Sequence, residues 1–173
     1  LMSVVHRPAE GMGVDAMTPA AAVAVVEAVE EVAGATPDLR IKWPNDVLLR
    51  GRKLAGVLVE VADGVAVVGV GLNVTAAPAG AACVHEVAPG AQRLAVAAAL
   101  VRQLQHWLDP AALPEAFARW RRRCETLGTR ASLRHGGQLI EGQVLDADPR
   151  LGLIVRRDSG EVVHLPGAST TRA

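Results

Sequence analysis

Residues 39–72 constrain the fold most strongly, because short apolar runs alternate there with tight turn signals. The apolar runs cover residues 39–42, 47–49, 53–61 and 65–72. Between them lie residues of the types that close tight turns: Pro44-Asn45-Asp46, Arg50-Gly51-Arg52 and Asp63-Gly64. Strands joined by connections this short pair antiparallel. The stretch therefore predicts an antiparallel sheet, and residues 1–7 predict a further strand that ends before Pro8.

Three helices are predicted beside this sheet. Thr18 and Pro19 have the pattern of an N-cap followed by proline at the first helical position, and Gly34 has that of a C-cap. Apolar residues recur at helical spacing in three groups: Ala21, Val25, Ala28, Val29 and Val32; Leu94, Ala97, Val101, Leu104 and Leu108; and Leu113, Phe117, Trp120 and Cys124. Residues 75–90 are expected to form a surface loop. The fold class is therefore α+β, with a mixed or largely antiparallel sheet and packed helices.

The composition changes near Gly128. From Ala131 onward, short apolar runs are separated by turn signals at Gly136-Gly137, Asp148-Pro149 and Asp158-Ser159-Gly160. This rhythm predicts a small barrel of about five strands. We place the boundary between the two domains at residues 126–130, which gives a first domain at 1–127 and a second at 128–173.

Charge and cysteine usage argue against several classes of protein. The formal net charge is zero, so bulk attraction to nucleic acid or to an acidic membrane is not expected. No charge-free apolar run reaches the length of about 18 residues that a membrane span needs. Cys83 and Cys124 lie far apart without metal-ligand spacing, which favours a reducing, cytoplasmic compartment and no metal site.

Charged and polar residues gather at the first turn of the sheet. Lys42 and Lys53 lie on closely connected strands, and both are expected to reach one pocket. A lysine ammonium suits a carboxylate or a phosphate, and a fixed cation stabilises charge that builds up on a phosphoryl group. Asn45 and Asp46 add an amide and a carboxylate, which can orient a lysine or hold Mg²⁺. The pattern indicates a site for an anionic small molecule; the alternative is an ordinary turn with two solvated lysines.

Glycines in the neighbouring strands support a ligand site. Gly56, Gly69 and Gly71 interrupt apolar strands, where an isolated glycine marks either a bulge or the close approach of another group. Asn73 follows the last of these strands as a second polar group. The spacing is neither that of a phosphate-binding loop nor that of a dinucleotide fingerprint. Trp43 is expected to lie in the core beneath the site, and Trp107 and Trp120 are expected to pack between helices.

Three motifs together resemble the bacterial biotin–protein ligase family. They are Lys42-Trp43-Pro44-Asn45-Asp46, Arg52-Lys53-Leu54-Ala55-Gly56-Val57-Leu58-Val59-Glu60 and Gly69-Val70-Gly71-Leu72-Asn73, in the same order and at close spacing. The predicted terminal barrel also resembles the SH3-like domain that ends these ligases. The resemblance implies a catalytic domain related to the class II aminoacyl-tRNA synthetases, followed by an SH3-like barrel.

The resemblance implies a two-step ligase that uses biotin, ATP and Mg²⁺. Biotin and ATP give biotinyl-5′-AMP, and a lysine of a biotin carboxyl carrier domain then attacks this anhydride. Lys53 matches the catalytic lysine that bridges the biotin carboxylate and the α-phosphate. Gly56, Leu58 and Gly69 match positions lining the biotin pocket, together with Lys53. The nucleotide side is matched by Lys42, Asn45, Asp46 and Asn73.

The sequence also departs from the family. Ligases of this kind carry, before the first strand seen here, a Gly-Arg-Gly-Arg-type loop that orders over biotin and the adenylate. We therefore expect the chain to be the C-terminal part of a ligase, with impaired activity in isolation.

Three other functions stay open at this point. One is a lipoate or octanoyl transferase, a second is a biotin-responsive regulator whose DNA-binding domain lies upstream, and a third is a non-catalytic remnant. Members of the family are monomers or dimers that pair through the central sheet, so the resemblance leaves both states open. Nucleic-acid binding is expected only if an upstream domain supplies it.

Overall fold

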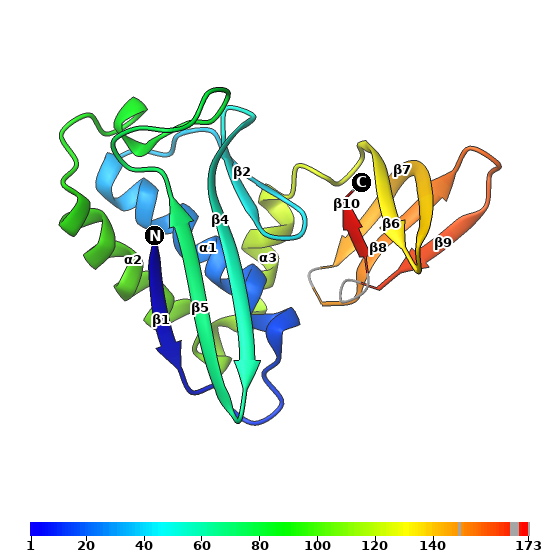
Figure 1. The fold of residues 1–173 in the computed structure, drawn as a ribbon, viewed down its shortest axis with the longest axis horizontal. Coiled ribbons are helices and arrows are strands. Elements are labelled where there is room, and N and C mark those ends of the chain that lie inside the picture. The colour runs from blue at the N-terminus through cyan, green and yellow to red at the C-terminus, as the bar shows by residue number, and fades with distance from the viewer. Residues whose placement is uncertain (149, 167–169, 173) are drawn as a thin grey trace.

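The computed structural model describes residues 1–148, 150–166 and 170–172, the last three by their backbone alone, and contains two antiparallel sheets. The first sheet has the strand order β1-β5-β4-β3-β2 (Figure 1). Its strands are β1 (Met2–His6), β2 (Leu39–Lys42), β3 (Asp46–Leu49), β4 (Arg52–Ala62) and β5 (Val65–Leu72). The strands predicted from residues 1–72 are thus confirmed, as is the α+β class.

Two hairpins give this sheet its register. Arg50 and Gly51 connect β3 to β4, and Asp63 and Gly64 connect β4 to β5, with φ values of 50°, 74°, 51° and 73°. Consecutive left-handed residues match the twist of a tight antiparallel hairpin. Asp63-Gly64 is therefore the hairpin that its sequence predicted, and it fixes which residues of β4 and β5 lie opposite each other.

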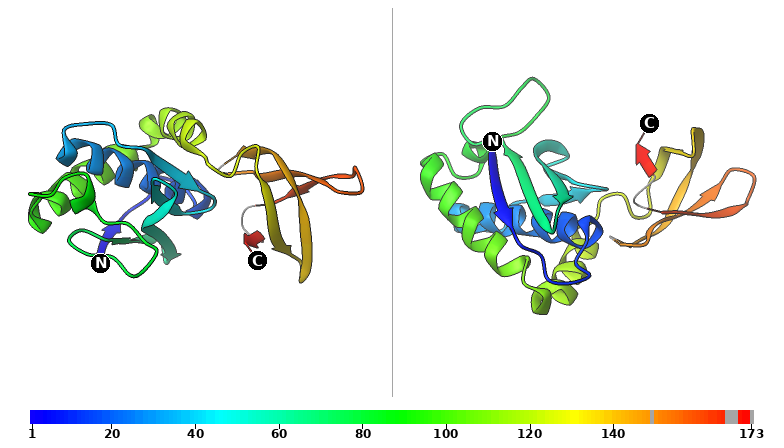
Figure 2. Two further views of the ribbon diagram at one scale, coloured as in Figure 1. Left: turned by 90° about the horizontal axis from the view of Figure 1, so that it is seen from above. Right: turned by 60° about the horizontal axis from the view of Figure 1, so that its bottom comes forward.

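Three helices cover one face of the first sheet and leave its other face open (Figures 1 and 2). They are α1 (Val14–Ala33), α2 (Arg93–Trp107) and α3 (Leu113–Arg123), and the short 3₁₀ helices η1 (Val84–Glu86) and η2 (Pro110–Ala112) lie in the connections. Both α2 and α3 pack against α1, which itself lies against β3 and β4. We refer to the uncovered side as the open face.

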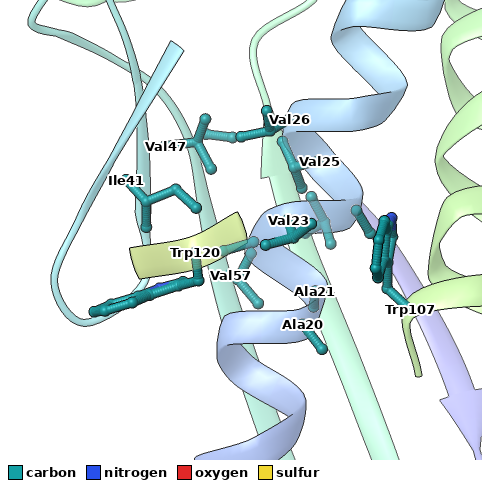
Figure 3. Packing of buried hydrophobic residues seen from close by; sticks show 14 of the residues in the cluster. Ala20, Ala21, Val23, Val25, Val26, Ile41, Val47, Val57, Trp107 and Trp120 are labelled. Carbon is teal, nitrogen blue, oxygen red and sulfur yellow. The ribbon is translucent and has the colours of Figure 1, made fainter. Parts of the chain in front are cut away.

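Helix α1 is the centre of the core. Its residues from Met17 to Val29 are almost all buried, with Ala20, Val23 and Val26 within 1% of complete burial. Figure 3 shows these small side chains facing both the sheet and the tryptophans of α2 and α3. A helix that is apolar on every side must be covered on every side. Trp107 and Trp120 are 4% and 0% exposed, so their predicted role in helix packing is confirmed.

The predicted start of α1 is wrong by one turn. The N-cap is Gly13, and Pro19 lies inside the helix rather than at its first position. Ala16 and Met17 are buried, so the additional turn covers apolar surface that a start at Thr18 would leave exposed. Asp15 lies in this first turn, where a negative charge favours the helix dipole. The predicted C-cap is confirmed, since Gly34 is left-handed at φ 60° and donates its N–H to the carbonyl of Glu31.

The predicted face of α2 is also partly wrong. Leu94 was assigned to the buried stripe but is 82% exposed, whereas Val96, Ala99 and Leu100 face the core. Leu104 belongs to the buried side as predicted. The helix carries apolar residues on nearly every side, so their spacing fits more than one face, and packing against α1 selects one.

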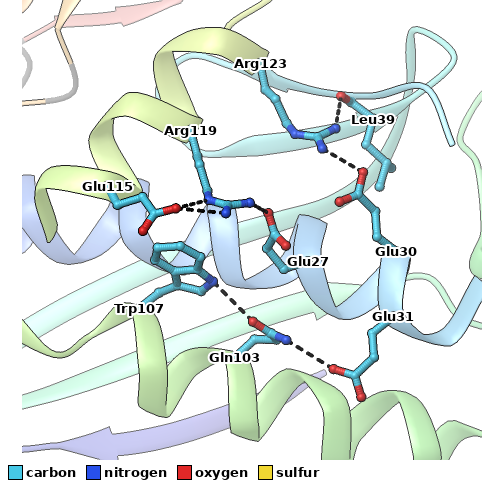
Figure 4. A network of polar contacts seen from close by, with 9 residues as sticks. All are labelled: Glu27, Glu30, Glu31, Leu39, Gln103, Trp107, Glu115, Arg119 and Arg123. Carbon is cyan, nitrogen blue, oxygen red and sulfur yellow. Dashed lines mark hydrogen bonds and ion pairs between the residues drawn. The ribbon is translucent and has the colours of Figure 1, made fainter. Parts of the chain in front are cut away.

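A row of glutamates on α1 ties α2 and α3 to it (Figure 4). Arg119 bonds Glu27 at 2.8 Å and also Glu115, and its guanidinium lies 5.1 Å from the centre of the Trp107 ring. These carboxylates raise the pKa of Arg119, and the largest cause is the hydrogen bonding that Arg119 donates to Glu115. The same pattern repeats along α1, where Arg123 pairs with Glu30 at 2.7 Å and Arg102 and Gln103 bond Glu31.

The segment at 75–90 is more ordered than a typical surface loop. It includes η1, and Ala82 and Val84 are fully buried. The backbone N–H of Ala82 bonds the carbonyl of Lys53 at 2.9 Å, and that of Val84 bonds the carbonyl of Asn73 at 2.9 Å. The segment is a surface loop as predicted, and in addition a short 3₁₀ helix and two buried residues hold it against the start of β4 and the end of β5.

The second sheet has the order β10-β6-β7-β8-β9. Its strands are β6 (Arg130–His135), β7 (Gln138–Asp148), β8 (Gly152–Arg157), β9 (Val162–Leu165) and β10 (Thr170–Arg172). Leu133, Val144, Leu153 and Val155 line its own small core. The predicted closed barrel is not confirmed, because the pairings of the described strands leave β9 and β10 unjoined. What the structure shows in this part of the chain is an antiparallel sheet of five strands.

The two sheets meet at the chain between α3 and β6. The N–H of Trp43 donates to the Oγ1 of Thr126 at 3.0 Å, and the N–H of Glu125 donates to the carbonyl of Ile41 at 2.9 Å. Arg121 bonds Asp146 at 2.5 Å and the carbonyl of Ala147 at 2.9 Å. The hydrogen bond from Arg121 lowers the pKa of Asp146.

No helix in the described part of the chain is long and apolar enough to cross a membrane.

Replacing Thr126 by valine is expected to destabilise the protein. Thr126 is 1% exposed and accepts the buried N–H of Trp43, so valine would leave that donor without a partner. The expected loss is about 1–3 kcal/mol of unfolding free energy, measured by urea titration. Thr36→Val is the matched control, since Thr36 is exposed and its hydroxyl makes no hydrogen bond to the described residues. Equal stability of the Thr126→Val variant and the unmodified protein would contradict this role.

Candidate functional site

A row of residues crosses the open face of the first sheet. Lys42 lies opposite Asp46, Asp46 opposite Gly56, and Gly56 opposite Gly71 in the pairings from β2 to β5. Residues that lie directly opposite one another in antiparallel strands project to the same face. One row further along, Leu58 lies opposite Gly69, which in turn lies opposite Ser3 of β1. The glycines therefore form a shallow floor between a charged end and an apolar end.

A break in the register of β4 brings Lys53 to this face. The pairing of β3 with β4 shifts between Val47 and Leu48, so that Leu54 is skipped. Leu54 and Ala55 are both buried in succession, whereas residues of a regular strand alternate between faces. A bulge of this kind re-aims the side chains before it. Without it, Lys53 would project to the helix-covered face, opposite to Gly56.

Lys53 forms an ion pair with Asp46 on the open face. The Nζ of Lys53 lies 2.6 Å from the Oδ1 of Asp46, and the two side chains are 55% and 28% exposed. An exposed pair contributes only about 0–1 kcal/mol, because water screens it. Its main consequence is therefore geometric: Asp46 holds the ammonium over Gly56, where an anion arriving from solvent can reach it.

Gly56 provides the room for this pair. A Cβ at this position would lie 3.3 Å from the Oδ1 of Asp46 and 3.5 Å from the Nζ of Lys53. The other two glycines are different, because a Cβ at Gly69 or at Gly71 would come no closer than 3.5 Å or 3.9 Å to its nearest neighbour. Neither has a positive φ angle. Protein packing and backbone conformation thus leave space at Gly69 and Gly71, which a flat ligand can use.

Asn45 fixes the turn that precedes Asp46. Its Nδ2 donates to the carbonyl of Val57 at 2.6 Å, and its carbonyl accepts the N–H of Val57 at 3.0 Å. The side chain thus imitates a strand partner beyond the end of β3. Trp43 is 2% exposed beneath this turn, so its predicted place in the core is confirmed.

Asn73 lies close to Lys53 because its backbone pairs with that of Leu54, the next residue along the chain. Its N–H bonds the carbonyl of Leu54, and its Nδ2 donates to the carbonyl of Ala82, both at 3.0 Å. The side-chain oxygen of Asn73 is the atom that these contacts leave for a ligand. Arg52 holds the same segment by bonding the carbonyl of Ala81 at 3.1 Å and the carboxylate of Glu86. Hydrogen bonds from Arg52 and from the N–H of Cys83 lower the pKa of Glu86.

A cavity of about 370 Å³ brings most of the predicted residues together on the open face. Its lining includes all four residues predicted to contact biotin, Lys53, Gly56, Leu58 and Gly69, and two of the predicted nucleotide residues, Asn45 and Asp46. Asn73 lines a separate cavity of about 490 Å³ with Thr75 and Arg93. Lys42 lines neither, although it projects to the same face as Asp46.

Sequence reasoning missed some residues of the site. Ser3 and Glu60 line the cavity of the open face, and Ala82 and Glu86 brace it from the segment at 75–90. A polar residue within an apolar strand was a usable signal for Ser3. The contacts of Ala82 and Glu86 join residues distant in sequence, and no local pattern marks them.

The oxygen donors of the site suit a magnesium ion that arrives with phosphates. Among the described residues, no group of three or more His, Cys, Asp and Glu side chains could hold a metal by itself. Asp46 offers a carboxylate and Asn73 an amide oxygen. Mg²⁺ in proteins is commonly held by one or two carboxylates together with substrate phosphates and water.

Comparison with known proteins gives one family and several relatives. Residues 2–75 match the model of the Biotin/lipoate A/B protein ligase family. The chain is 39% identical over 170 residues to the biotin–[acetyl-CoA-carboxylase] ligase of Mycobacterium tuberculosis. The aligned region covers 84% of this chain and 61% of that relative. It is 37% identical over 117 residues to the enzyme of the same name from Paracoccus denitrificans, covering 62% of the chain and 46% of that relative. The chain thus spans less than two thirds of either relative.

The fold is that of solved biotin protein ligases. The apo structure of the enzyme from Aquifex aeolicus has a TM-score of 0.82 and 21% identity, covering 99% of this chain and 81% of that one. The same enzyme in complex with biotin and ATP has a TM-score of 0.79 and 23% identity, covering 99% and 77%. At this identity the likeness concerns the fold, and it extends through both sheets.

Two single variants, Gly56→Ala and Gly71→Ala, test whether the space above each glycine is filled by protein side chains or is free for a ligand. Alanine in a strand is favoured over glycine by about 0.5–1 kcal/mol, and Gly71→Ala should show this gain in a urea titration. Gly56→Ala should be less stable than Gly71→Ala, because its Cβ displaces the Asp46 carboxylate. Equal gains for the two variants would show that the ion pair does not occupy this space.

Proposed function

We propose that the chain, whose residues 2–75 match the model of the Biotin/lipoate A/B protein ligase family, catalyses the ATP-dependent biotinylation of a lysine in a carrier protein. The acceptor is a biotin carboxyl carrier domain of acetyl-CoA carboxylase or a related carboxylase. The observation that carries the proposal is the position of Lys53, whose ammonium stands over a glycine floor beside Asp46.

The first step joins two anions, and the positive charge of Lys53 reduces the repulsion between them. The carboxylate oxygen of biotin attacks the α-phosphorus of ATP, the bond to the β-phosphate breaks, and pyrophosphate leaves. A cation between the carboxylate and the α-phosphate stabilises the charge that develops there. We assign this role to Lys53, with Asp46 orienting its ammonium at 2.6 Å before substrates arrive.

The second step transfers the acyl group. The neutral amine of the carrier lysine attacks the carbonyl carbon of biotinyl-5′-AMP, an amide bond forms, and AMP leaves with the electrons of the broken anhydride bond. The proton lost by the amine needs an acceptor, and the carboxylate of Asp46 lies on the exposed side of the site. The open face gives a protein acceptor access to this point.

We place biotin on the glycine floor. Gly69 and Gly71 leave room for a flat ring, Gly56 lies beneath the Lys53–Asp46 pair at the charged end, and Leu58, which is 61% exposed, adds an apolar contact. Lys53 lies at the charged end, where the carboxylate of biotin belongs. Burying an exposed leucine under an apolar ligand is favourable by about 25 cal/mol per Å² of apolar surface removed from water.

We place the ATP phosphates between Lys53 and Asn73. The backbone pairing of Asn73 with Leu54 brings these residues together. Lys42 adds a positive charge on the same face, and Asn45 holds the turn. Magnesium bound to the phosphates would be held by Asp46 and the side-chain oxygen of Asn73, and it would neutralise phosphate charge.

The remaining assignments follow the same family. We propose a catalytic domain at 1–127 and a second domain at 128–173, supported by the two separate sheets. For the second sheet we propose the form of an SH3-like barrel. The pairing register of the long strand β7 shifts between Val144 and Asp146. Such an irregularity bends a strand, and strands of small barrels are bent in this way. We also propose that the protein is cytoplasmic and that two copies of it pair through the first sheet.

Replacing Lys53 by alanine tests the catalytic assignment. The unmodified chain should form biotinyl-AMP from labelled ATP only when biotin is present, and Lys53→Ala should lower this rate by about 100-fold or more. Lys53 is 55% exposed, so the thermal unfolding of the variant should be unchanged. Lys42→Ala, which also removes a lysine from this face, should have the smaller effect.

Two results would count against the proposal. A Lys53→Ala variant with full activity would remove Lys53 from its role, and activation of lipoate in preference to biotin would change the substrate.

Replacing Gly69 by alanine tests the position of biotin. The methyl group has space in the protein, since its nearest neighbour is the carbonyl of Leu58 at 3.5 Å. The variant should unfold at the same or a higher urea concentration, and its Kd for biotin should rise by about tenfold or more through overpacking. Isothermal titration with biotin measures this, and an unchanged Kd would move biotin away from Gly69.

A further inference from the structure

Arg52 has no role in the steps above, yet it holds the backbone on both sides of Ala82. Its Nη1 donates to the carbonyl of Ala81 at 3.1 Å, and its Nη2 donates to the carboxylate of Glu86. The other oxygen of this carboxylate accepts the backbone N–H of Cys83 at 3.1 Å. One guanidinium thus reaches the residue before Ala82 directly and the residue after it through Glu86. We refer to Arg52 and Glu86 as the clamp.

Ala82 in turn fixes which way the side-chain amide of Asn73 faces. The carbonyl of Ala82 accepts a hydrogen bond from the Nδ2 of Asn73 at 3.0 Å. A carbonyl oxygen can only accept, so the NH₂ end of the amide must face Ala82. The Oδ1 of Asn73 then faces away from Ala82. The direction of one backbone carbonyl therefore sets the direction of the side-chain oxygen that a ligand can reach.

The peptide that follows Ala82 carries the effect of Glu86 to Asn73. This peptide is trans, so its carbonyl and its N–H point in opposite directions from one rigid plane. Its N–H, from Cys83, is bonded to Glu86, and its carbonyl, from Ala82, is bonded to Asn73. Turning the plane would break both bonds. The carboxylate of Glu86 thus holds the carbonyl that orients Asn73.

The peptide that precedes Ala82 is held in the same way. Its carbonyl, from Ala81, accepts from Arg52, and its N–H, from Ala82, donates to the carbonyl of Lys53 at 2.9 Å. Each of the two peptides is therefore bonded to the clamp at one end and to a residue of the site at the other. Ala82 itself is fully buried, which leaves it little room to shift.

The clamp contributes orientation rather than stability. The side chains of Arg52 and Glu86 are 43% and 29% exposed, and an ion pair this accessible to water contributes little to the stability of a fold. Its geometry is specific, because the N–H groups of a guanidinium lie at fixed angles in one plane. Two of them bond two acceptors of the same loop here.

We propose that Arg52 and Glu86 are positioning residues for the nucleotide, which hold the Oδ1 of Asn73 toward the ATP phosphates and their magnesium. The inference rests on the proposed function, which places these phosphates between Lys53 and Asn73. The biotin cavity lies apart from the clamp, because none of residues 73–92, all of which the structure describes, lines it. Loss of the clamp should therefore lower the affinity for ATP alone.

Isothermal titration of the whole chain with ATP and Mg²⁺, and separately with biotin, tests this. The Kd for ATP should rise by about tenfold or more in Arg52→Ala and in Glu86→Ala, the usual effect of removing a group that orients a ligand of a metal. The Kd for biotin should be unchanged. Arg52→Lys should lose most of the same affinity for ATP, because an ammonium lacks the planar pair of donors.

Arg50→Ala is the matched control. The charge of Arg50 also lowers the pKa of Glu86, so this variant removes a positive charge near the same carboxylate. Its side chain forms no hydrogen bond with the described residues, and the backbone of the loop is left as it was. The Kd for ATP should therefore stay close to that of the unmodified chain.

A double-mutant cycle with Asn73 adds a result that a merely structural role would not give. Asn73→Ala removes the amide through which the clamp acts, so adding Arg52→Ala should raise the Kd for ATP no further. A general loosening of the protein by Arg52→Ala would raise the Kd equally with and without Asn73. Urea unfolding of the same variants should show that all of them fold, since the pair of Arg52 and Glu86 is exposed.

The outcomes separate this inference from the function on which it rests. If the unmodified chain binds ATP and biotin, and Arg52→Ala binds ATP equally well, the inference is overturned and the function stands. If Arg52→Ala weakens ATP and biotin alike, or has its full effect in the Asn73→Ala background, the clamp supports the fold and the inference is also overturned. If the unmodified chain binds no ATP, the proposed function is wrong, and the inference fails with it.

Discussion

The burial of α1 is the constraint on which the rest of the structure depends. From Met17 to Val29 the alanines and valines of α1 are buried on nearly every side, and the first sheet, α2 and α3 together cover them, with the glutamates of α1 bonded to arginines of α2 and α3. All three helices therefore lie on one face of the sheet. The opposite face is left for polar and small residues, and the row from Lys42 to Gly71 lies there. The location of the site thus follows from where the core is.

The electrostatics of the site depend on one exposed pair. Lys53 and Asp46 are too accessible to water to contribute much stability, so their contact matters for position. Asp46 keeps the ammonium over the glycine floor, and the space beside Gly69 and Gly71 stays empty in the protein alone. A carboxylate and a phosphate can then enter from solvent and share one cation. This arrangement suits a reaction whose first difficulty is the repulsion of two anions.

The second sheet is joined to the first by contacts that converge on the same turn. Thr126 accepts the N–H of Trp43 directly beneath Asn45, and Arg121 reaches from α3 to Asp146. Arg150 of the second sheet also lines a cavity of about 520 Å³ together with Trp43, Pro44 and Asn45 of that turn. These contacts fix the C-terminal part of the chain next to the turn that carries Asn45 and Asp46.

The sequence alone determined the strands, the hairpin at Asp63-Gly64 and the approximate helices, and it supplied the candidate residues of the site, because turn residues, apolar spacing and motifs are local patterns. It did not determine the start of α1 or the buried face of α2, since a helix that is apolar on several sides has more than one possible face. Nor did it determine that Lys53 shares a face with Gly56. Regular alternation would separate them, and only the bulge at Leu54, which arises from pairing between β3 and β4, brings them together. The cavity that Arg150 lines together with Trp43 and Pro44 likewise exists only because the tertiary structure joins residues distant in sequence.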